Sequence, residues 1–202
     1  MLSVVDHLFH ELSEGRNDRE ARISIFERIR DIPYAIVPRL INAENYLEIL
    51  TIGKGSCTPK HLLLADLYKK LGLTVLLAVY PFRWADVDIE LPPRLEKQAL
   101  SLPDDHHLAC KVEIEGKLIL IDATVDIPLQ ILGLPVNIGW DGKVDMLMPV
   151  NPSGDEQLFD PSEAKYINNV YIDDEHLAFF NSLNHWLSEI RKRGTTVNNK
   201  IT

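Results

Sequence analysis

Apolar residues recur every three or four positions over much of the N-terminal third of the chain, a spacing that predicts amphipathic helices. A first helix is expected from residue 2 to residue 12, with a break near Gly15. A second helix starts at Asp18, which suits an N-cap, and stops before Pro33. A third and shorter helix is expected from residue 42 to residue 50.

The strongest helix pattern lies between residues 58 and 72. Thr58 suits the N-cap, Pro59 suits the first helical position, and Gly72 supplies a C-terminal stop. The apolar stripe of this helix consists of Leu63, Leu64, Leu67, Tyr68 and Leu71.

A run of β-branched and apolar residues from 74 to 80 predicts a strand that Pro81 ends. The following segment, residues 81 to 104, is rich in Pro, Asp and Arg and is expected to be a long connection with a short helix near 94–100. Long connections inside compact domains are often functional.

Residues 107 to 124 have the alternating pattern of a β-hairpin, with Glu115-Gly116 at the tight turn. With that turn, position 107 lies opposite position 124. Asp122 is then two residues away on the partner strand and points to the same face as His107. Cys110 has the opposite parity and is interpreted as a small core residue.

Residues 126 to 171 contain many Pro, Gly, Asn and Asp, and turns with one or two strands are expected there. A final helix is predicted from Asp174 to Arg193, and the tail 194–202 is expected to be frayed. The length favours a single domain over residues 1–193. The buried side of the last helix is predicted to carry Leu177, Phe180, Leu187 and Ile190.

Composition narrows the function classes. The formal net charge is −9, which argues against general affinity for nucleic acid or for anionic membranes. The compact basic run, residues 191–193, is interpreted as complementing the end of the last helix. The two cysteines form no disulfide framework, and no signal peptide or membrane span is expected, so the default is a soluble cytoplasmic protein of unknown oligomeric state.

Three residues carry the candidate chemistry: Cys57, His107 and Asp122. A cysteine at a helix N-terminus is placed to become a thiolate, because the helix dipole and the free N–H groups favour negative charge there. A histidine held by a carboxylate is the usual partner that takes the thiol proton. These residues predict a cysteine nucleophile with His107 as base and Asp122 as the group that orients it.

The arrangement resembles the transglutaminase-like superfamily over residues 53–125. The resemblance lies in Cys57 at the head of a helix that ends Leu-Tyr-Lys-Lys-Leu-Gly-Leu, in the strand from His107 to Ile114, and in the strand Ile-Leu-Ile-Asp-Ala-Thr that contains Asp122. It implies a papain-like α+β fold, with N-terminal helices packed on an antiparallel sheet and the catalytic cysteine at a helix N-terminus.

The same resemblance implies a Cys-His-Asp triad that forms a thioester from an amide or ester. Hydrolysis, as in a peptidase or amidase, is expected rather than cross-linking, with a peptide, a protein or a small amide as substrate and no cofactor. The chain lacks the glutamine that papain-like enzymes place before the cysteine. The backbone N–H of Cys57 is one candidate oxyanion donor, and Asn42, Asn45 and Tyr46 are candidates for a second.

Three alternatives remain open. A zinc site could use Cys57, His61, His106, His107 and Cys110, although none of the usual zinc-ligand spacings is present. A catalytically inactive binding module could keep the same fold. An acyltransferase of the arylamine N-acetyltransferase type has the same order of triad residues.

Further residues are candidates for the substrate cleft. His61 is interpreted as a helix surface residue near the cleft, and His106 as a loop residue beside it. Arg83 and Trp84 could line a groove, and Trp140 lies in a turn that could flank it. The acidic residues Asp86, Asp88 and Glu90 are interpreted as a solvated face.

Overall fold

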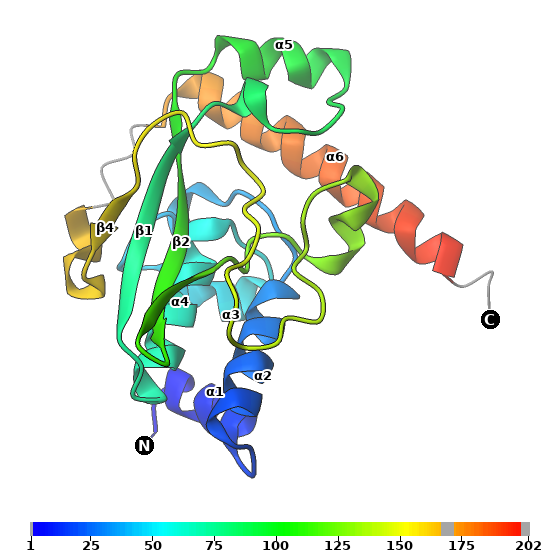
Figure 1. Ribbon diagram of the computed structural model, residues 1–202. Helices are drawn as coiled ribbons and strands as arrows, with labels where there is room; N and C mark the ends of the chain where they lie inside the picture. Colours follow the sequence, from blue (N-terminus) through cyan, green and yellow to red (C-terminus); the bar gives the residue numbers. More distant parts are fainter. Residues whose placement is uncertain (1, 167–171, 199–202) are drawn as a thin grey trace.

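The computed structural model describes residues 2–166 and 172–198 and has an α+β architecture (Figure 1). Its antiparallel sheet has the strand order β3-β2-β1-β4. The strands are β1 (Val75–Phe82), β2 (Asp105–Ile114), β3 (Lys117–Ile121) and β4 (Gln157–Phe159). The helices are α1 (Val4–Ser13), α2 (Asp18–Arg30), α3 (Ile49–Ile52), α4 (Cys57–Lys70), α5 (Pro93–Ser101) and α6 (Asp174–Asn198). The α+β class and the antiparallel sheet agree with the sequence prediction.

The start of α2 differs from the prediction by one residue. Asn17, and not Asp18, is the N-cap, because the Asn17 side chain accepts hydrogen bonds from the N–H groups of Arg19 and Glu20. Glu20 accepts in return from the Asn17 N–H, which completes a capping box. Asp18 is therefore the first helical residue, where its charge still complements the helix dipole.

The helix predicted over residues 42–50 is wrong in its first half. Asn42 accepts hydrogen bonds from the backbone N–H groups of residues 44 and 45, which holds a local turn in place of a helix. A short 3₁₀ turn, Tyr46–Glu48, then leads into α3. Gly53 ends α3 with φ +71°, a conformation that favours glycine.

Helix α4 is buried on nearly every side and packs against β1, β2 and α2. It begins at Cys57 with Ser56 as its N-cap, so Thr58 is not the cap that the sequence predicted. Pro59 still lies in the first turn, where its missing N–H leaves no bond unmade. The predicted stripe residues Leu63, Leu64 and Leu67 are fully buried.

Strand β1 continues through Pro81 to Phe82, so the prediction that Pro81 ends the strand is wrong. Pro81 pairs with His106 on the β2 side. On the other side β4 pairs only with Leu77 to Val79. Beyond β4, the Ser153 N–H donates to the Pro81 carbonyl at 2.8 Å, a bond that proline can accept although it has no N–H to donate.

The β2–β3 hairpin has the predicted turn and register. Glu115 and Gly116 form the turn with φ +53° and +78°, and Ile114 pairs with Lys117. Cys110 is fully buried in the main core, as expected from its parity. The predicted short helix in the connection before β2 is also confirmed, as α5.

The segment after β3 is mostly turns, as predicted. It contains a 3₁₀ turn at Ile127–Leu132, strand β4 and a second 3₁₀ turn at Pro161–Tyr166. Residues 167–171, for which the prediction also covered turns or strands, lie outside the described residues.

Helix α6 is longer than predicted. It runs to Asn198 and so extends into the tail that the sequence predicted to be frayed, and residues 199–202 lie outside the described residues. Leu177 is exposed because it lies one position off the buried stripe. That stripe consists of His176, Phe179, Phe180, Leu183 and Leu187.

Two main groups of buried apolar side chains fill the molecule. One lies between the N-terminal helices, α4 and the sheet. The other joins α5, α6 and the 3₁₀ turn at Ile127–Leu132, and Figure 1 shows α5 and α6 together at one end of the molecule. Within the described residues, no helix has the length and apolar character needed to cross a membrane.

Candidate active site

Cys57 is the first residue of α4, and its half-buried side chain lines a cavity. Backbone hydrogen bonds hold the chain segment directly before Cys57. The Gly55 N–H donates to the Pro33 carbonyl at 3.1 Å, and the Ala35 N–H donates to the Gly55 carbonyl at 3.1 Å. A Cβ at position 55 would lie 2.6 Å from Ile49 Cδ1, so only glycine fits at this close approach. The first N–H groups of a helix have no partners inside it, so the start of α4, where Cys57 lies, carries partial positive charge.

His107 and Asp122 form a buried pair. His107 Nε2 donates to Asp122 Oδ2 at 2.6 Å, and their exposed fractions are 2% and 3%. Burial alone would lower the pKa of His107, but the charge and hydrogen bond of Asp122, together with the Cys57 side chain, raise that pKa. Burial likewise opposes ionisation of Asp122, and the His107 charge lowers the pKa of that carboxyl. The pair therefore favours imidazolium beside carboxylate.

Asp122 is held in one orientation by its surroundings. Its Oδ1 accepts a hydrogen bond from the Thr124 N–H at 2.9 Å, which leaves Oδ2 for His107. The Asp122 N–H lies 3.2 Å from the sulfur of Met146. The aspartate thus fixes Nε2 of the imidazole and leaves Nδ1 for the thiol.

A second histidine, His61, joins the nucleophile to the aspartate strand. Its Nδ1 donates to the Cys57 carbonyl at 2.9 Å, and its Nε2 accepts from the Ala123 N–H at 3.0 Å. This pattern requires the neutral tautomer with the proton on Nδ1. Burial lowers the pKa of His61 to about 4, although the Asp122 carboxylate acts in the opposite direction. The prediction that His61 is a helix surface residue is wrong, because α4 has no exposed face at this position.

Acid should destabilise the protein in part through His61. Its pKa in the folded state lies below the ordinary value of 6.5, so its neutral form contributes stability above pH 6.5 that is lost as the pH falls towards 4. Glutamine cannot titrate. Between pH 7 and pH 4.5, we therefore expect the free energy of unfolding to fall by about 2 kcal/mol less in His61→Gln than in the native protein. Urea unfolding of both proteins at the two pH values measures this difference. Equal losses in the two proteins would contradict it.

Lys60, which is buried in the core, binds the same backbone segment after Asp122 as His61 does. Its ammonium group donates to the carbonyls of Arg30 at 2.9 Å, Ala123 at 3.1 Å and Thr124 at 2.8 Å. The side chain is fully buried, and burial lowers its pKa to about 7, against the opposing charges of nearby carboxylates. Lys60 and His61 together bind the backbone directly after Asp122, so α4 positions both the thiol and the aspartate.

A partly buried ion pair connects α6 to this region. Arg191 donates from Nε and Nη2 to the two oxygens of Asp126 at 2.7 and 2.6 Å. Asp126 also accepts from the Tyr34 N–H at 2.8 Å, and Arg191 donates to the Tyr34 carbonyl at 2.8 Å. The basic run 191–193 therefore does not simply end the last helix, since α6 continues and Arg191 pairs with Asp126.

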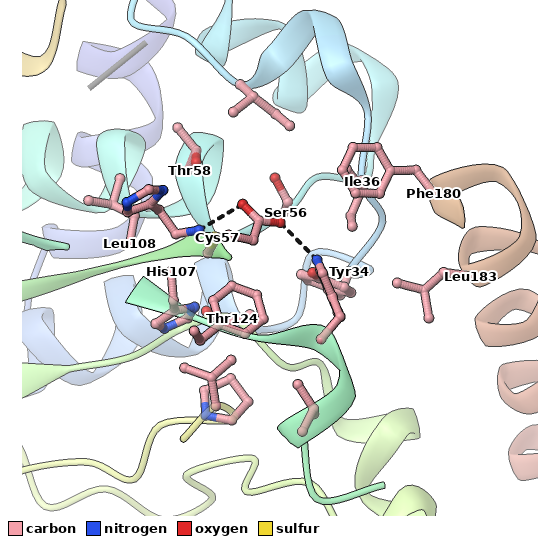
Figure 2. A pocket seen from close by; sticks show the side chains of 18 of the residues that line it. Tyr34, Ile36, Ser56, Cys57, Thr58, His107, Leu108, Thr124, Phe180 and Leu183 are labelled. Atoms are coloured by element: carbon pink, nitrogen blue, oxygen red, sulfur yellow. Dashed lines mark hydrogen bonds between the residues drawn. The ribbon is translucent and has the colours of Figure 1, made fainter. Parts of the chain in front are cut away.

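The cavity beside Cys57 has a volume of about 510 Å³. Its lining comes from the segment 34–41, from the start of α4, from the strand ends near His107 and from α6. Figure 2 shows Cys57 and Ser56 between His107 on one side and Phe180 of α6 on the other. The nucleophile and its histidine thus face a space that is largely bounded by apolar side chains.

The predicted cleft residues divide into two groups. Trp84 and His106 line the cavity, and both are tied to Asp105: Trp84 Nε1 donates to one carboxylate oxygen at 2.8 Å and the His106 N–H to the other at 2.7 Å. Arg83 does not line the cavity, because its exposed side chain pairs with Asp104 at 3.9 Å.

Trp140 is also outside the cavity, so its assignment to the cleft is wrong. It is a core residue whose ring packs edge-on against Phe26 at 5.4 Å, and its Nε1 donates to the Val144 carbonyl. His61 is likewise buried away from the cavity lining.

The proposed second oxyanion donors are occupied elsewhere or lie outside the cavity. Asn42 bonds within its own turn, and the Tyr46 hydroxyl donates to Asp66. None of the three candidates, Asn42, Asn45 and Tyr46, lines the cavity. In residues 2–166 and 172–198, no three His, Cys, Asp or Glu side chains are grouped to hold a metal ion, so the zinc alternative has no ligand set there.

Sequence reasoning missed several residues of the site. Lys60 is spaced four and seven positions before the stripe residues Leu64 and Leu67, a signal that it lies on a buried face. Ser56 and Thr124 also line the cavity; their hydroxyls are buried and have no hydrogen-bond partner among the described residues. No sequence pattern predicts that Ser56 and Thr124 belong to the site.

Comparison with known proteins leaves the family open. No protein-family model matches the chain, and no curated protein matches it. One solved structure, from Cytophaga hutchinsonii and named a "Putative Cysteine Protease", is similar with 16% identity and a TM-score of 0.42. The matched region covers 76% of this chain and 47% of the other, so this chain spans about half of that protein.

Proposed function

We propose that this chain is a cysteine-nucleophile enzyme, of the transglutaminase-like, papain-like type that its sequence resembles. It would form a thioester from an amide or ester substrate and release the acyl group to water. The observation that carries the proposal is the buried His107–Asp122 hydrogen bond of 2.6 Å beside Cys57, a half-buried cysteine that opens a helix and lines a cavity.

The first chemical step transfers a proton within the triad. Nδ1 of His107 accepts the thiol proton of Cys57, and Asp122 stabilises the imidazolium that results. The thiolate attacks the substrate carbonyl, and the imidazolium then gives its proton to the departing amine or alcohol. His107, neutral again, takes a proton from water, which attacks the thioester carbonyl and frees the acid together with the Cys57 thiol.

The developing oxyanion needs donors close to the thiol. The backbone N–H of Cys57 is one, since the first N–H groups of a helix have no partners within it. The hydroxyl of Ser56 is the second donor that we assign. Ser56 lines the cavity, and its buried hydroxyl has no partner among the described residues, even though an N-cap serine usually bonds its own helix.

Hydrolysis is favoured over cross-linking by the size of the cavity. A volume of about 510 Å³ is typical of a site for one small ligand or one substrate side chain. Water needs no further room as the acceptor. A protein-borne amine would have to share this space with the acyl group.

Alkylation by iodoacetamide tests the proposal, because a thiol paired with a histidine base reacts at a pH where an ordinary thiol does not. We expect Cys57 to be alkylated at pH 6 at least tenfold faster in the native protein than in His107→Ala. His106→Ala, which changes a neighbouring histidine of the cavity lining, is the matched control and should react like the native protein.

The second cysteine does not confuse this measurement. Cys110 is fully buried, and burial raises the pKa of its thiol, so it should stay unmodified until the protein unfolds. Peptide mass spectrometry locates the label. Equal and slow alkylation of Cys57 in the native protein and in His107→Ala would reject the enzyme and leave a binding module.

A further inference from the structure

We infer that the cavity beside Cys57 binds an uncharged, apolar group on the acyl side of the scissile bond. This inference rests on the proposed function and names its substrate class. The apolar group is either an alkyl or aryl acyl chain or the side chain of a hydrophobic amino acid, and these two sources share the same chemistry.

The cavity wall away from the triad is apolar. It is formed by side chains that come from five separate segments: Ile36, Phe82, Leu129, Val150, Phe180 and Leu183. Apolar walls favour an apolar ligand, because the binding of such a group removes both surfaces from water. The volume of about 510 Å³ falls within the ordinary range for small-ligand sites.

The charges around the cavity exclude an anionic acyl group. Among the described residues that line it, no lysine or arginine is present, whereas Asp104, Asp105 and Asp173 are. Asp105 is already held by Trp84 and the His106 N–H, and Asp173 by His176. A carboxylate on the ligand would meet the like charge of these aspartates, with no lysine or arginine among the described lining residues to balance it.

The direction of the substrate follows from the position of His107. The leaving group takes its proton from His107 and must lie on that side of the thiol. In Figure 2, Phe180 and Leu183 lie on the opposite side of Cys57 from His107. The acyl portion therefore extends towards α6, into the apolar part of the cavity.

Two buried hydroxyls independently point to a ligand at this place. Ser56 and Thr124 each have an exposed fraction of 4%, and neither hydroxyl has a partner among the described residues. Buried hydroxyls without partners are unfavourable, and most are satisfied in folded proteins. A substrate carbonyl placed at Cys57 would accept from Ser56, and a polar atom next to that carbonyl would pair with Thr124.

The test is a series of p-nitrophenyl esters with acetyl, butanoyl, hexanoyl and octanoyl groups, assayed with the Cys57→Ala protein as the blank. We expect kcat/KM to rise about threefold to fourfold for each added methylene up to at least hexanoyl. The monoadipoyl ester, which matches hexanoyl in length but ends in a carboxylate, should react at least tenfold more slowly than hexanoyl. An N-acylated phenylalanine ester distinguishes the sources, because it should surpass octanoyl if the natural group is an amino-acid side chain.

Filling the cavity should remove the preference. We expect Leu183→Trp, and separately Val150→Phe, to abolish the gain in kcat/KM from the acetyl to the hexanoyl ester. Leu177→Trp is the matched control on the same helix, because Leu177 is exposed and does not line the cavity. Its chain-length profile should be that of the native protein.

The outcomes separate this inference from the proposed function. Cys57-dependent hydrolysis with no dependence on chain length would overturn the inference and leave the enzyme. If no ester is hydrolysed through Cys57, the proposed function fails. The binding of an uncharged probe then tests whether the cavity accepts an apolar group. The uncharged probe N-phenyl-1-naphthylamine should bind the native protein and be displaced by octanamide, but should not bind Leu183→Trp. A native protein that does not bind the probe, or a Leu183→Trp protein that binds it equally well, would overturn the inference.

Discussion

Replacing Asp122 by asparagine should lower kcat for p-nitrophenyl hexanoate about 10³–10⁴-fold. The reason is the 2.6 Å hydrogen bond in which Asp122 Oδ2 accepts from His107. An amide nitrogen in that position would donate, which would force the imidazole into the tautomer that cannot take the thiol proton. Asparagine keeps the size of the side chain, and its oxygen can still accept from the Thr124 N–H, so the fold should persist.

The control for this variant is Asp145→Asn. Asp145 also accepts a backbone hydrogen bond in the sheet region, from the Leu120 N–H at 2.6 Å, but it does not contact the triad. We expect its kcat to remain within about twofold of the native value. Steady-state kinetics of both variants at pH 7, with urea unfolding to verify the fold, decides the matter. An Asp122→Asn protein with kcat within threefold of native would remove the aspartate from the mechanism.

The largest effect on stability is expected from Lys60→Met, which should lower the free energy of unfolding by about 3 kcal/mol. Methionine fills a similar volume but leaves the carbonyls of Arg30, Ala123 and Thr124 without their shared donor. Relief from burying an ammonium group offsets part of this loss, but three unpaired buried acceptors outweigh it.

Urea unfolding at pH 7 measures the effect of Lys60→Met. Lys69→Met, a change of the same kind at an exposed position of α4, should alter stability by less than about 0.5 kcal/mol. A Lys60 variant within 1 kcal/mol of the native protein would mean that the burial of the ammonium cancels its hydrogen bonds.

The hairpin shows what local sequence can specify. The pair Glu115-Gly116 determined the turn, the turn determined the register, and the register placed His107 and Asp122 on one face. Each step depends on residues close together in the chain, and strand parity has only two values. The position of Cys57 at a helix start was predictable for the same reason, although the cap is Ser56 and not Thr58.

Burial was harder to predict than element type. A helical pattern in the sequence predicts one apolar stripe and one solvent-exposed face, and it places His61 on the exposed face. In the structure α4 is enclosed on nearly all sides, so His61 and Lys60 are both buried. The coverage comes from α2, from the sheet and from the residues after β3, which are remote in sequence. Trp140 was misplaced for the same reason, since its partner is Phe26.

The ion pair between Arg191 and Asp126 shows that the site depends on residues far beyond the stretch that contains Cys57, His107 and Asp122. The two residues are 65 positions apart, yet the pair joins the last helix to Tyr34, beside the entry to the nucleophile. The motif-bearing stretch 53–125 stops one residue short of Asp126. A protein truncated before Arg191 would leave the buried Asp126 carboxylate without its cation. Helix α6, which forms one wall of the cavity beside Cys57, would also lose its attachment to that region.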